Sequence, residues 1–155
     1  KAIESIDKAI DLLNDKKLKA VKLNIVAIKN FNDDEILDFV EFIRHRPIEL
    51  RLIEFMPFDK NQWNNSKFIS FYEQRKIIED GLGIKLQKTD DLEKDKSQTS
   101  KTYSIEGYQG KIGFITSMSQ NFCGGCNRLR VSADGNLFIC LFDNREINLK
   151  EMLDL

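Results

Sequence analysis

The sequence predicts an α/β fold that leads into a segment of antiparallel hairpins. In the first half, apolar residues recur alternately at the spacing of a helix and in short β-branched runs, as in an α/β layer. Beyond a polar stretch at residues 88–101, which we interpret as a surface loop, apolar residues alternate with a period of two. We therefore expect two parts, one on each side of this stretch.

Two helices and two strands are expected before residue 57. Apolar residues at helical spacing predict helices over residues 3–13 and 36–43, and β-branched runs predict strands over residues 21–28 and 50–56. Two strands joined by a helix of this length form a βαβ unit, whose strands pair in parallel. A parallel sheet normally has more than two strands, and other elements cover both of its faces. This part is therefore expected to belong to a larger barrel or sheet.

Capping signals mark two helix boundaries. Asn32 and Glu35 have the spacing of a capping box that opens the second helix, and Ser70 with Glu73 forms another that opens a third helix. Gly81 stands where the third helix is expected to end.

Two hairpins are expected in the second part, within residues 102–118 and 129–142. Asp134-Gly135 is a strong signal for a two-residue turn in the second hairpin. With that turn, Leu129 lies opposite Cys140. A short helix is expected to begin at Asn148.

Composition narrows the classes of function. The formal net charge is -1, from 24 basic and 25 acidic residues, so no overall field attracts nucleic acid or an anionic membrane. No apolar run approaches the roughly 20 residues that cross a bilayer. The odd, clustered set of three cysteines argues against a secreted disulfide framework. We expect a protein of the cytoplasm or an organelle matrix that binds neither nucleic acid nor membranes.

The cysteines have the spacing C-x2-C-x13-C, at Cys123, Cys126 and Cys140. A structural zinc site needs four ligands, and the single histidine, His45, lies far upstream. A 4Fe–4S cluster held by three thiolates leaves one iron open, which suits substrate binding. A disulfide with a spare thiol and inert thiols are the other interpretations, and the spacing alone leaves all of them open.

Arg128 and Arg130 lie two residues apart on the expected strand, so they share a face with Cys126. Two guanidiniums beside an open metal site suit bidentate recognition of a phosphate or a base edge. Alternating arginines on a hairpin are also typical of a solvated face. Both interpretations remain open at this point.

The run Phe122-Cys-Gly-Gly-Cys-Asn-Arg-Leu-Arg, with Gly135 and Cys140 beyond it, closely resembles the C-terminal cluster motif of the GTP 3′,8-cyclase family. This family is also called molybdenum cofactor biosynthesis protein A. Residues 21–26 and 50–57 resemble two further stretches of the family, and the similarity extends in order along essentially the whole chain.

The resemblance implies a radical S-adenosylmethionine enzyme on an incomplete TIM-like (β/α) barrel. Residues 1–83 would be the C-terminal part of the barrel, and residues 84–155 a molybdenum cofactor synthesis domain with the second 4Fe–4S cluster. In the family, an N-terminal 4Fe–4S cluster cleaves S-adenosylmethionine, and the resulting radical starts the conversion of GTP to (8S)-3′,8-cyclo-7,8-dihydroguanosine 5′-triphosphate for molybdopterin. The open iron of the C-terminal cluster binds the guanine.

The resemblance also implies roles for single residues, none of them catalytic in this chain. The cluster ligands would be Cys123, Cys126 and Cys140. The residues in contact with GTP would be Lys22, Arg51, Arg128, Leu129 and Arg130. Met56 would line the S-adenosylmethionine pocket. The oligomeric state, monomer or homodimer, is left open.

Elementary physical chemistry is compatible with two of these roles. Lys22 lies in the middle of an apolar run, and a buried ammonium needs an anionic partner such as a phosphate, whereas a half-exposed strand would let it reach water. Arg51 is interleaved between apolar residues in the same manner, and a structural pair with Glu54 is the alternative to a contact with GTP.

Two departures from the family limit the expectation. The C-x3-C-x2-C motif of the first cluster and the glycine-ended tail of the family do not occur in this sequence. We therefore expect the segment to be inactive by itself. The alternatives are the auxiliary-cluster region of another radical S-adenosylmethionine enzyme and a zinc-stabilised binding module without catalysis.

Overall fold

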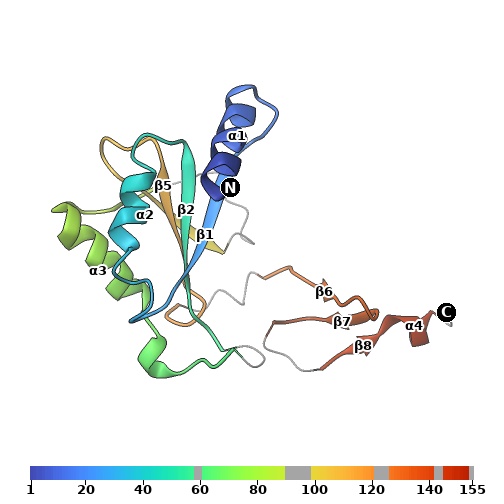
Figure 1. The fold of residues 1–155 in the computed structure, drawn as a ribbon. Helices are drawn as coiled ribbons and strands as arrows, with labels where there is room; N and C mark the ends of the chain where they lie inside the picture. Colours follow the sequence, from blue (N-terminus) through green and yellow to red (C-terminus); the bar gives the residue numbers. More distant parts are fainter. Residues whose placement is uncertain (58–60, 90–98, 121–125, 142–144, 154–155) are drawn as a thin grey trace.

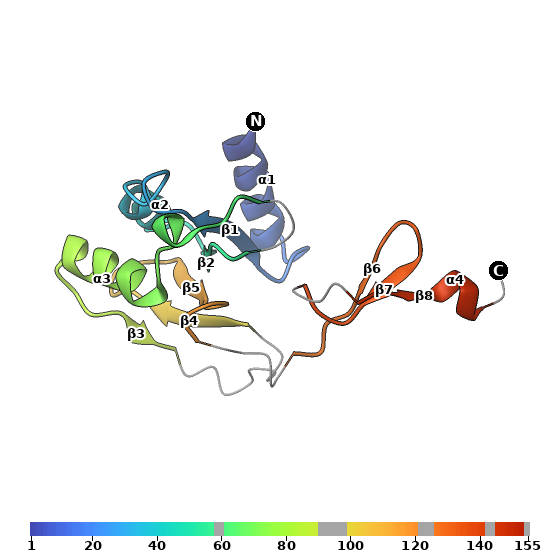
Figure 2. The same ribbon diagram turned by 90° about the horizontal axis from the view of Figure 1, so that it is seen from below.

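The computed structural model describes residues 1–57, 61–89, 99–120, 126–141 and 145–153. They form a mixed five-stranded sheet packed with helices and a smaller antiparallel sheet of three strands (Figure 1). The small sheet lies to one side of the large one (Figure 2). The predicted α/β class with an antiparallel extension is thus confirmed at this level. Across these ranges, no helix combines the length and apolarity needed to cross a membrane.

The predicted βαβ unit is confirmed. Strands β1 (Val21–Ala27) and β2 (Ile48–Glu54) pair in parallel, and helix α2 (Ile36–Phe42) connects them. Strand β5 (Lys111–Ile115) pairs in parallel with the other side of β2. Strands β4 (Ser100–Ser104) and β3 (Gln87–Lys88) continue the sheet antiparallel, in the order β1-β2-β5-β4-β3. The sheet therefore continues across residue 83.

The apolar core lies on one face of this sheet. Helices α2 and α3 (Phe71–Leu82) pack there against buried side chains of β2 and β5, including Leu52 and Phe114. Helix α1 (Ala2–Asn14) packs against β1 through partly buried apolar residues. Side chains alternate along a strand, so the other face carries different residues. We call it the polar sheet face after its polar residues on the parallel strands, which include Lys22, Asn24, Glu49 and Arg51, with Gly113 beside Arg51.

The predicted capping box at Asn32 is wrong. The N-cap of α2 is Glu35, without a capping hydrogen bond from its side chain. Asn32 instead bonds the backbone at the end of β1 and directly after it: its Oδ1 accepts from Ile28 N at 2.8 Å, and its Nδ2 donates to Val26 O at 3.0 Å. Short amide side chains often satisfy nearby backbone groups in this way, and this backbone competes successfully for Asn32.

The box at Ser70 is confirmed, but the predicted end of α3 is wrong. Ser70 N donates to Glu73 Oε2 at 2.9 Å, and Ser70 Oγ accepts from Glu73 N at 3.2 Å. Helix α3 continues through Gly81, and its C-cap is Gly83 with φ 66°. Gly81 serves helix packing, because a Cβ there would lie 2.5 Å from Leu37 Cδ1.

The surface loop predicted over residues 88–101 is wrong at both ends. Lys88 pairs with Tyr103, and Ser100 begins β4 opposite Ile115. Residues 90–98 lie outside the described ranges. Strand β3 is a short, exposed edge strand, and polar residues suit such an edge because they discourage further pairing. Strand β3 was therefore missed in the sequence because its residues are polar.

The C-terminal elements agree in part with prediction. Helix α4 (Leu149–Met152) begins after Asn148, whose Oδ1 accepts from Lys150 N at 3.0 Å. Strand β8 (Ile147–Asn148) was not predicted. It pairs with β7 (Asn136–Phe138), the second strand of the second hairpin, and completes the small sheet.

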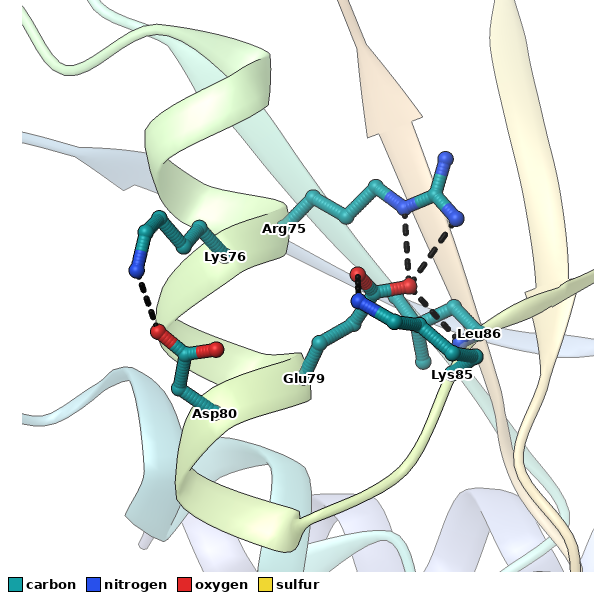
Figure 3. A network of polar contacts seen from close by, with 6 residues as sticks. All are labelled: Arg75, Lys76, Glu79, Asp80, Lys85 and Leu86. Atoms are coloured by element: carbon teal, nitrogen blue, oxygen red, sulfur yellow. Dashed lines mark hydrogen bonds and ion pairs between the residues drawn. The ribbon is translucent and has the colours of Figure 1, made fainter.

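An ionic network attaches the C-terminal half of α3 to the segment that leads into β3 (Figure 3). Glu79, whose side chain is 9% exposed, accepts hydrogen bonds from Arg75 Nη2 at 2.9 Å, Leu86 N at 2.9 Å and Lys85 Nζ at 3.1 Å. Burial raises the pKa of Glu79, but these hydrogen bonds and the charge of Arg75 outweigh it and lower the pKa from 4.5 to about 2.

Replacing Glu79 by glutamine is expected to lower the free energy of unfolding by about 2 kcal/mol at neutral pH. This figure is below the full equivalent of the pKa shift, because solvent screens Arg75 and Lys85, which are 34% and 83% exposed. The folded-state pKa is the lower one, so the stabilisation is complete above pH 4.5 and is lost as the pH falls toward about 2.

Urea unfolding of both proteins from neutral pH to about pH 3 measures this difference. The exposed pair Lys76–Asp80 on the same helix is the control (Figure 3). Asp80→Asn is expected to change stability by less than about 0.5 kcal/mol. Equal losses in the two variants, or a loss at Glu79 that does not depend on pH, would contradict the prediction.

Candidate functional site

The turn of the second hairpin has three residues, where two were predicted. Ser132 N donates to Asn136 O at 2.9 Å, and Gly135 N donates to Ser132 O at 3.0 Å. Gly135 has φ 88°, which glycine adopts without strain. Asp134-Gly135 fits a three-residue turn as well as a two-residue one, because both place glycine at a left-handed position.

This turn shifts the strand pairing by one residue. Strands β6 (Arg130–Val131) and β7 (Asn136–Phe138) pair with Arg130 opposite Phe138. Asn136 therefore lies opposite Ser132, not opposite Ala133 as a two-residue turn requires. A slip of one residue exchanges the faces of a strand. The pairing ends at Arg130 and Phe138, and Ile139 is a bend, so the predicted placement of Leu129 opposite Cys140 lies beyond the paired residues.

Two of the three predicted cluster ligands are described. Cys126 is exposed and Cys140 is half-buried, whereas Cys123 lies outside the described residues. A hydrogen bond from the backbone N–H of Arg128 lowers the pKa of the Cys126 thiol, and the Arg128 side chain and the charge of Arg130 lower it further. Cys126 is thus biased toward the thiolate, which is the form that binds metals.

Among the described residues, no group of three His, Cys, Asp or Glu side chains is arranged to hold a metal ion. That set contains only Cys126 and Cys140 of the predicted ligands. The donors that are described suit a soft metal centre, since thiolates favour iron–sulfur clusters and zinc. The guanidiniums of Arg128 and Arg130 would offset the negative charge of a thiolate-bound cluster.

Lys22 and Arg51 meet on the polar sheet face, where both contact Glu49. Arg51 Nε donates to Glu49 Oε1 at 2.8 Å, and Lys22 Nζ lies 4.0 Å from Glu49 Oε2. Within the described ranges, no hydrogen bond involves the terminal Nη groups of Arg51. The Lys22 side chain is 44% exposed, so it reaches water as the half-exposed alternative expected. The two predicted GTP contacts are therefore adjacent, and Glu49 is a neighbour that the sequence analysis missed.

The expected pair between Arg51 and Glu54 is wrong. Residues three apart on a strand face opposite sides, and Glu54 points to the core side, where it is 1% exposed. Arg51 pairs with Glu49 because residues two apart share a face. The same period-two rule, applied to the sequence, could have found this pair.

Gly113 leaves space for the Glu49 contacts. A Cβ at Gly113 would overlap Ser100 Oγ and lie 3.1 Å from Glu49 Oε1. Ser100 Oγ in turn donates to Glu49 Oε1 at 3.3 Å. A glycine inside a strand often marks such a close approach, and that is the only sequence signal for it.

Met56 follows the C-terminal end of β2 and is half-buried. Its carbonyl accepts from Asn61 Nδ2 at 2.8 Å. A cavity of about 520 Å³ lies at this end of β1 and β2, where barrel enzymes bind their ligands. The residues that line it are Ile28, Lys29, Asn30, Phe31, Phe55, Asn61, Ser66 and Lys67. No sequence motif pointed to Lys29, in the turn after β1, or to Lys67, at the end of the short 3-10 helix Asn65–Lys67.

Comparison with known proteins confirms the resemblance. The family described as Molybdenum Cofactor Synthesis C matches residues 48–155. The chain is 48% identical over 153 residues to molybdenum cofactor biosynthesis protein 1 of Dictyostelium discoideum. This alignment covers 99% of this chain and 24% of that protein. It is 43% identical over 154 residues to the mitochondrial GTP 3′,8-cyclase of Arabidopsis thaliana, and 42% identical over 154 residues to the GTP 3′,8-cyclase of Syntrophomonas wolfei.

The last two alignments each cover 99% of this chain, but 37% and 45% of the relatives. The chain thus spans less than half the length of these proteins. The family match covers more than half of the chain and includes the second hairpin and all three cysteines. This chain therefore belongs to the Molybdenum Cofactor Synthesis C family.

Proposed function

We propose that the chain is the C-terminal part of a GTP 3′,8-cyclase, which converts GTP to (8S)-3′,8-cyclo-7,8-dihydroguanosine 5′-triphosphate in molybdopterin biosynthesis. The observation that carries this proposal is the identity of 42% and 43% over 99% of the chain to two proteins named as that cyclase. S-adenosylmethionine and a further 4Fe–4S cluster would be bound mainly by the remainder of the protein.

We further propose that residues 1–83 supply part of a radical S-adenosylmethionine barrel and residues 84–155 the cluster-binding domain. The parallel pairing of β1, β2 and β5 supports the barrel, as does the placement of the helices on one face of the sheet. In such a barrel the polar sheet face would line the interior, and Met56 would lie at the C-terminal strand ends beside S-adenosylmethionine.

In this proposal, Cys123, Cys126 and Cys140 hold a 4Fe–4S cluster. When bound, a cluster with three protein ligands supplies an iron with an open coordination position for the base. Arg128 and Arg130, which lower the pKa of the nearby Cys126 thiol, orient the nucleotide at that position. Leu129, between the two arginines, completes the proposed contacts with GTP.

Lys22 and Arg51 bind the phosphates. Glu49 engages Arg51 only through Nε, which leaves the terminal Nη groups for bidentate contact with an anion. Lys22 adds a second positive charge on the neighbouring strand. The chain's own contribution is thus to hold the two ends of the nucleotide.

Anaerobic reconstitution of the full-length protein with iron and sulfide tests the proposal. We expect iron and sulfide to be incorporated, GTP to bind, and the cyclised triphosphate to form with S-adenosylmethionine and a reductant, as detected by mass spectrometry. Uptake of one zinc without sulfide would instead support the binding-module alternative. A loaded protein that ignores GTP would support another radical S-adenosylmethionine enzyme.

A further inference from the structure

A buried carboxylate lies at the C-terminal end of β2, and the proposed function does not use it. Glu54 is 1% exposed. Its Oε1 accepts from Phe71 N at 2.8 Å, and its Oε2 accepts from Met118 N at 2.6 Å and Ser119 N at 2.8 Å. In the described part of the chain, no cationic side chain forms an ion pair with it. Backbone N–H groups therefore compensate its charge.

These contacts join three segments that are distant in sequence. Phe71 is the first residue of α3, so the positive end of the helix dipole faces the Glu54 carboxylate. Met118 and Ser119 belong to a turn, residues 116–120, that follows β5. Glu54 thus ties β2, the start of α3 and this turn to one point.

The turn at residues 116–120 is held by further bonds. Gln120 N donates to Thr116 O at 3.3 Å, and Thr116 Oγ1 donates to Gln120 O at 3.2 Å. Gln120 Nε2 donates to Tyr72 OH at 2.9 Å on α3, and Gln120 Oε1 accepts from Lys101 Nζ on β4. In the sequence, Gln120 stands three residues before Cys123. The chain therefore leaves the sheet toward the cysteines from a fixed position.

Glu54 also lies on the same strand as Arg51, three residues further along. A nucleotide held by its phosphates at Arg51 and by its base at the cluster needs a fixed spacing between these two sites. We infer that Glu54 is a positioning residue that sets this spacing, because it anchors the turn at residues 116–120, which precedes the cysteines in the sequence, to the strand that carries Arg51. The inference rests on the proposed function.

The variant Glu54→Gln tests it in the full-length protein. Glutamine has one acceptor oxygen, and its NH₂ group would face an N–H donor, so at least one of the three backbone bonds must break. The matched control is Glu79→Gln, which removes another buried carboxylate that accepts a backbone N–H, but near the end of α3 and away from the turn.

Two measurements separate a positioning role from a general loss of stability. In protein without a cluster, exchange of the Met118 and Ser119 amides through local opening, measured where it outpaces global unfolding, is expected to accelerate by about tenfold or more in Glu54→Gln. It is expected to stay unchanged in Glu79→Gln, whose loss of stability acts on global unfolding. In reconstituted protein, the Kd for GTP per loaded cluster is expected to rise by about tenfold in Glu54→Gln and by less than about twofold in Glu79→Gln.

The variant in which Cys123, Cys126 and Cys140 are all alanine gives the baseline for iron and sulfide. Unchanged exchange at Met118 and Ser119, unchanged affinity for GTP in Glu54→Gln, or equal effects in the two glutamine variants would overturn the inference. A wild-type protein that takes up no more iron and sulfide than the triple variant would instead refute the proposed function, which the hydrogen-exchange result does not depend on.

Discussion

Replacing Cys126 by serine is expected to abolish loading of the C-terminal cluster and to reduce formation of the cyclised product by more than about a hundredfold. Loss of residues that merely support a metal ligand costs about 10–100-fold, so loss of a ligand itself should cost more. Serine is nearly isosteric, but its hydroxyl does not ionise near neutral pH, whereas Arg128 and Arg130 bias the Cys126 thiol toward the thiolate.

Iron and sulfide content and product formation in the reconstituted full-length protein measure this effect. A suitable control is Ile139→Ser, which introduces the same hydroxyl beside Cys140 at a side chain that is 51% exposed. This control should load the cluster normally. If Cys126→Ser loaded and turned over like the wild type, Cys126 would not be a ligand.

Features that depend on neighbouring residues could be predicted from the sequence. The βαβ unit follows from periodicity alone, and the Ser70–Glu73 box is confirmed because both of its hydrogen bonds lie within one helical turn. The predicted box at Asn32 is wrong because its side-chain amide can either cap a helix or bond the backbone that precedes it. In the structure it bonds the backbone of Val26 and Ile28. Local signals are therefore reliable where only one local structure satisfies them.

The candidate site depends on choices of one residue and on long-range pairing. Asp134-Gly135 correctly located the hairpin turn, but not whether it has two or three residues, and that difference decides whether Ser132 or Ala133 lies opposite Asn136. The contacts of Glu54 join residues 54, 71, 118 and 119, which only the folded sheet brings together. No pattern within one segment encodes such a contact.

Replacing Arg51 by alanine is expected to raise the KM for GTP by about 10–100-fold while kcat changes by less than about threefold. Hydrogen bonds to charged groups contribute about 1.5–3 kcal/mol, and a contact with the phosphates acts on binding and not on the reacting atoms. Lysine should restore only part of the affinity, because a single ammonium cannot bond Glu49 and also present two parallel donors to a phosphate.

Steady-state kinetics at two salt concentrations, with direct GTP binding, measure the effect. Arg46→Ala removes a guanidinium that donates to Phe42 O at 3.0 Å and stacks on the Phe42 ring, away from the polar sheet face, and should change KM by less than about twofold. If Arg51→Ala left the affinity for GTP unchanged, Arg51 and Glu49 would be an internal ion pair that only supports the sheet. A fall in kcat at constant KM would place Arg51 at the reacting end of the nucleotide, because only transition-state contacts act in that way.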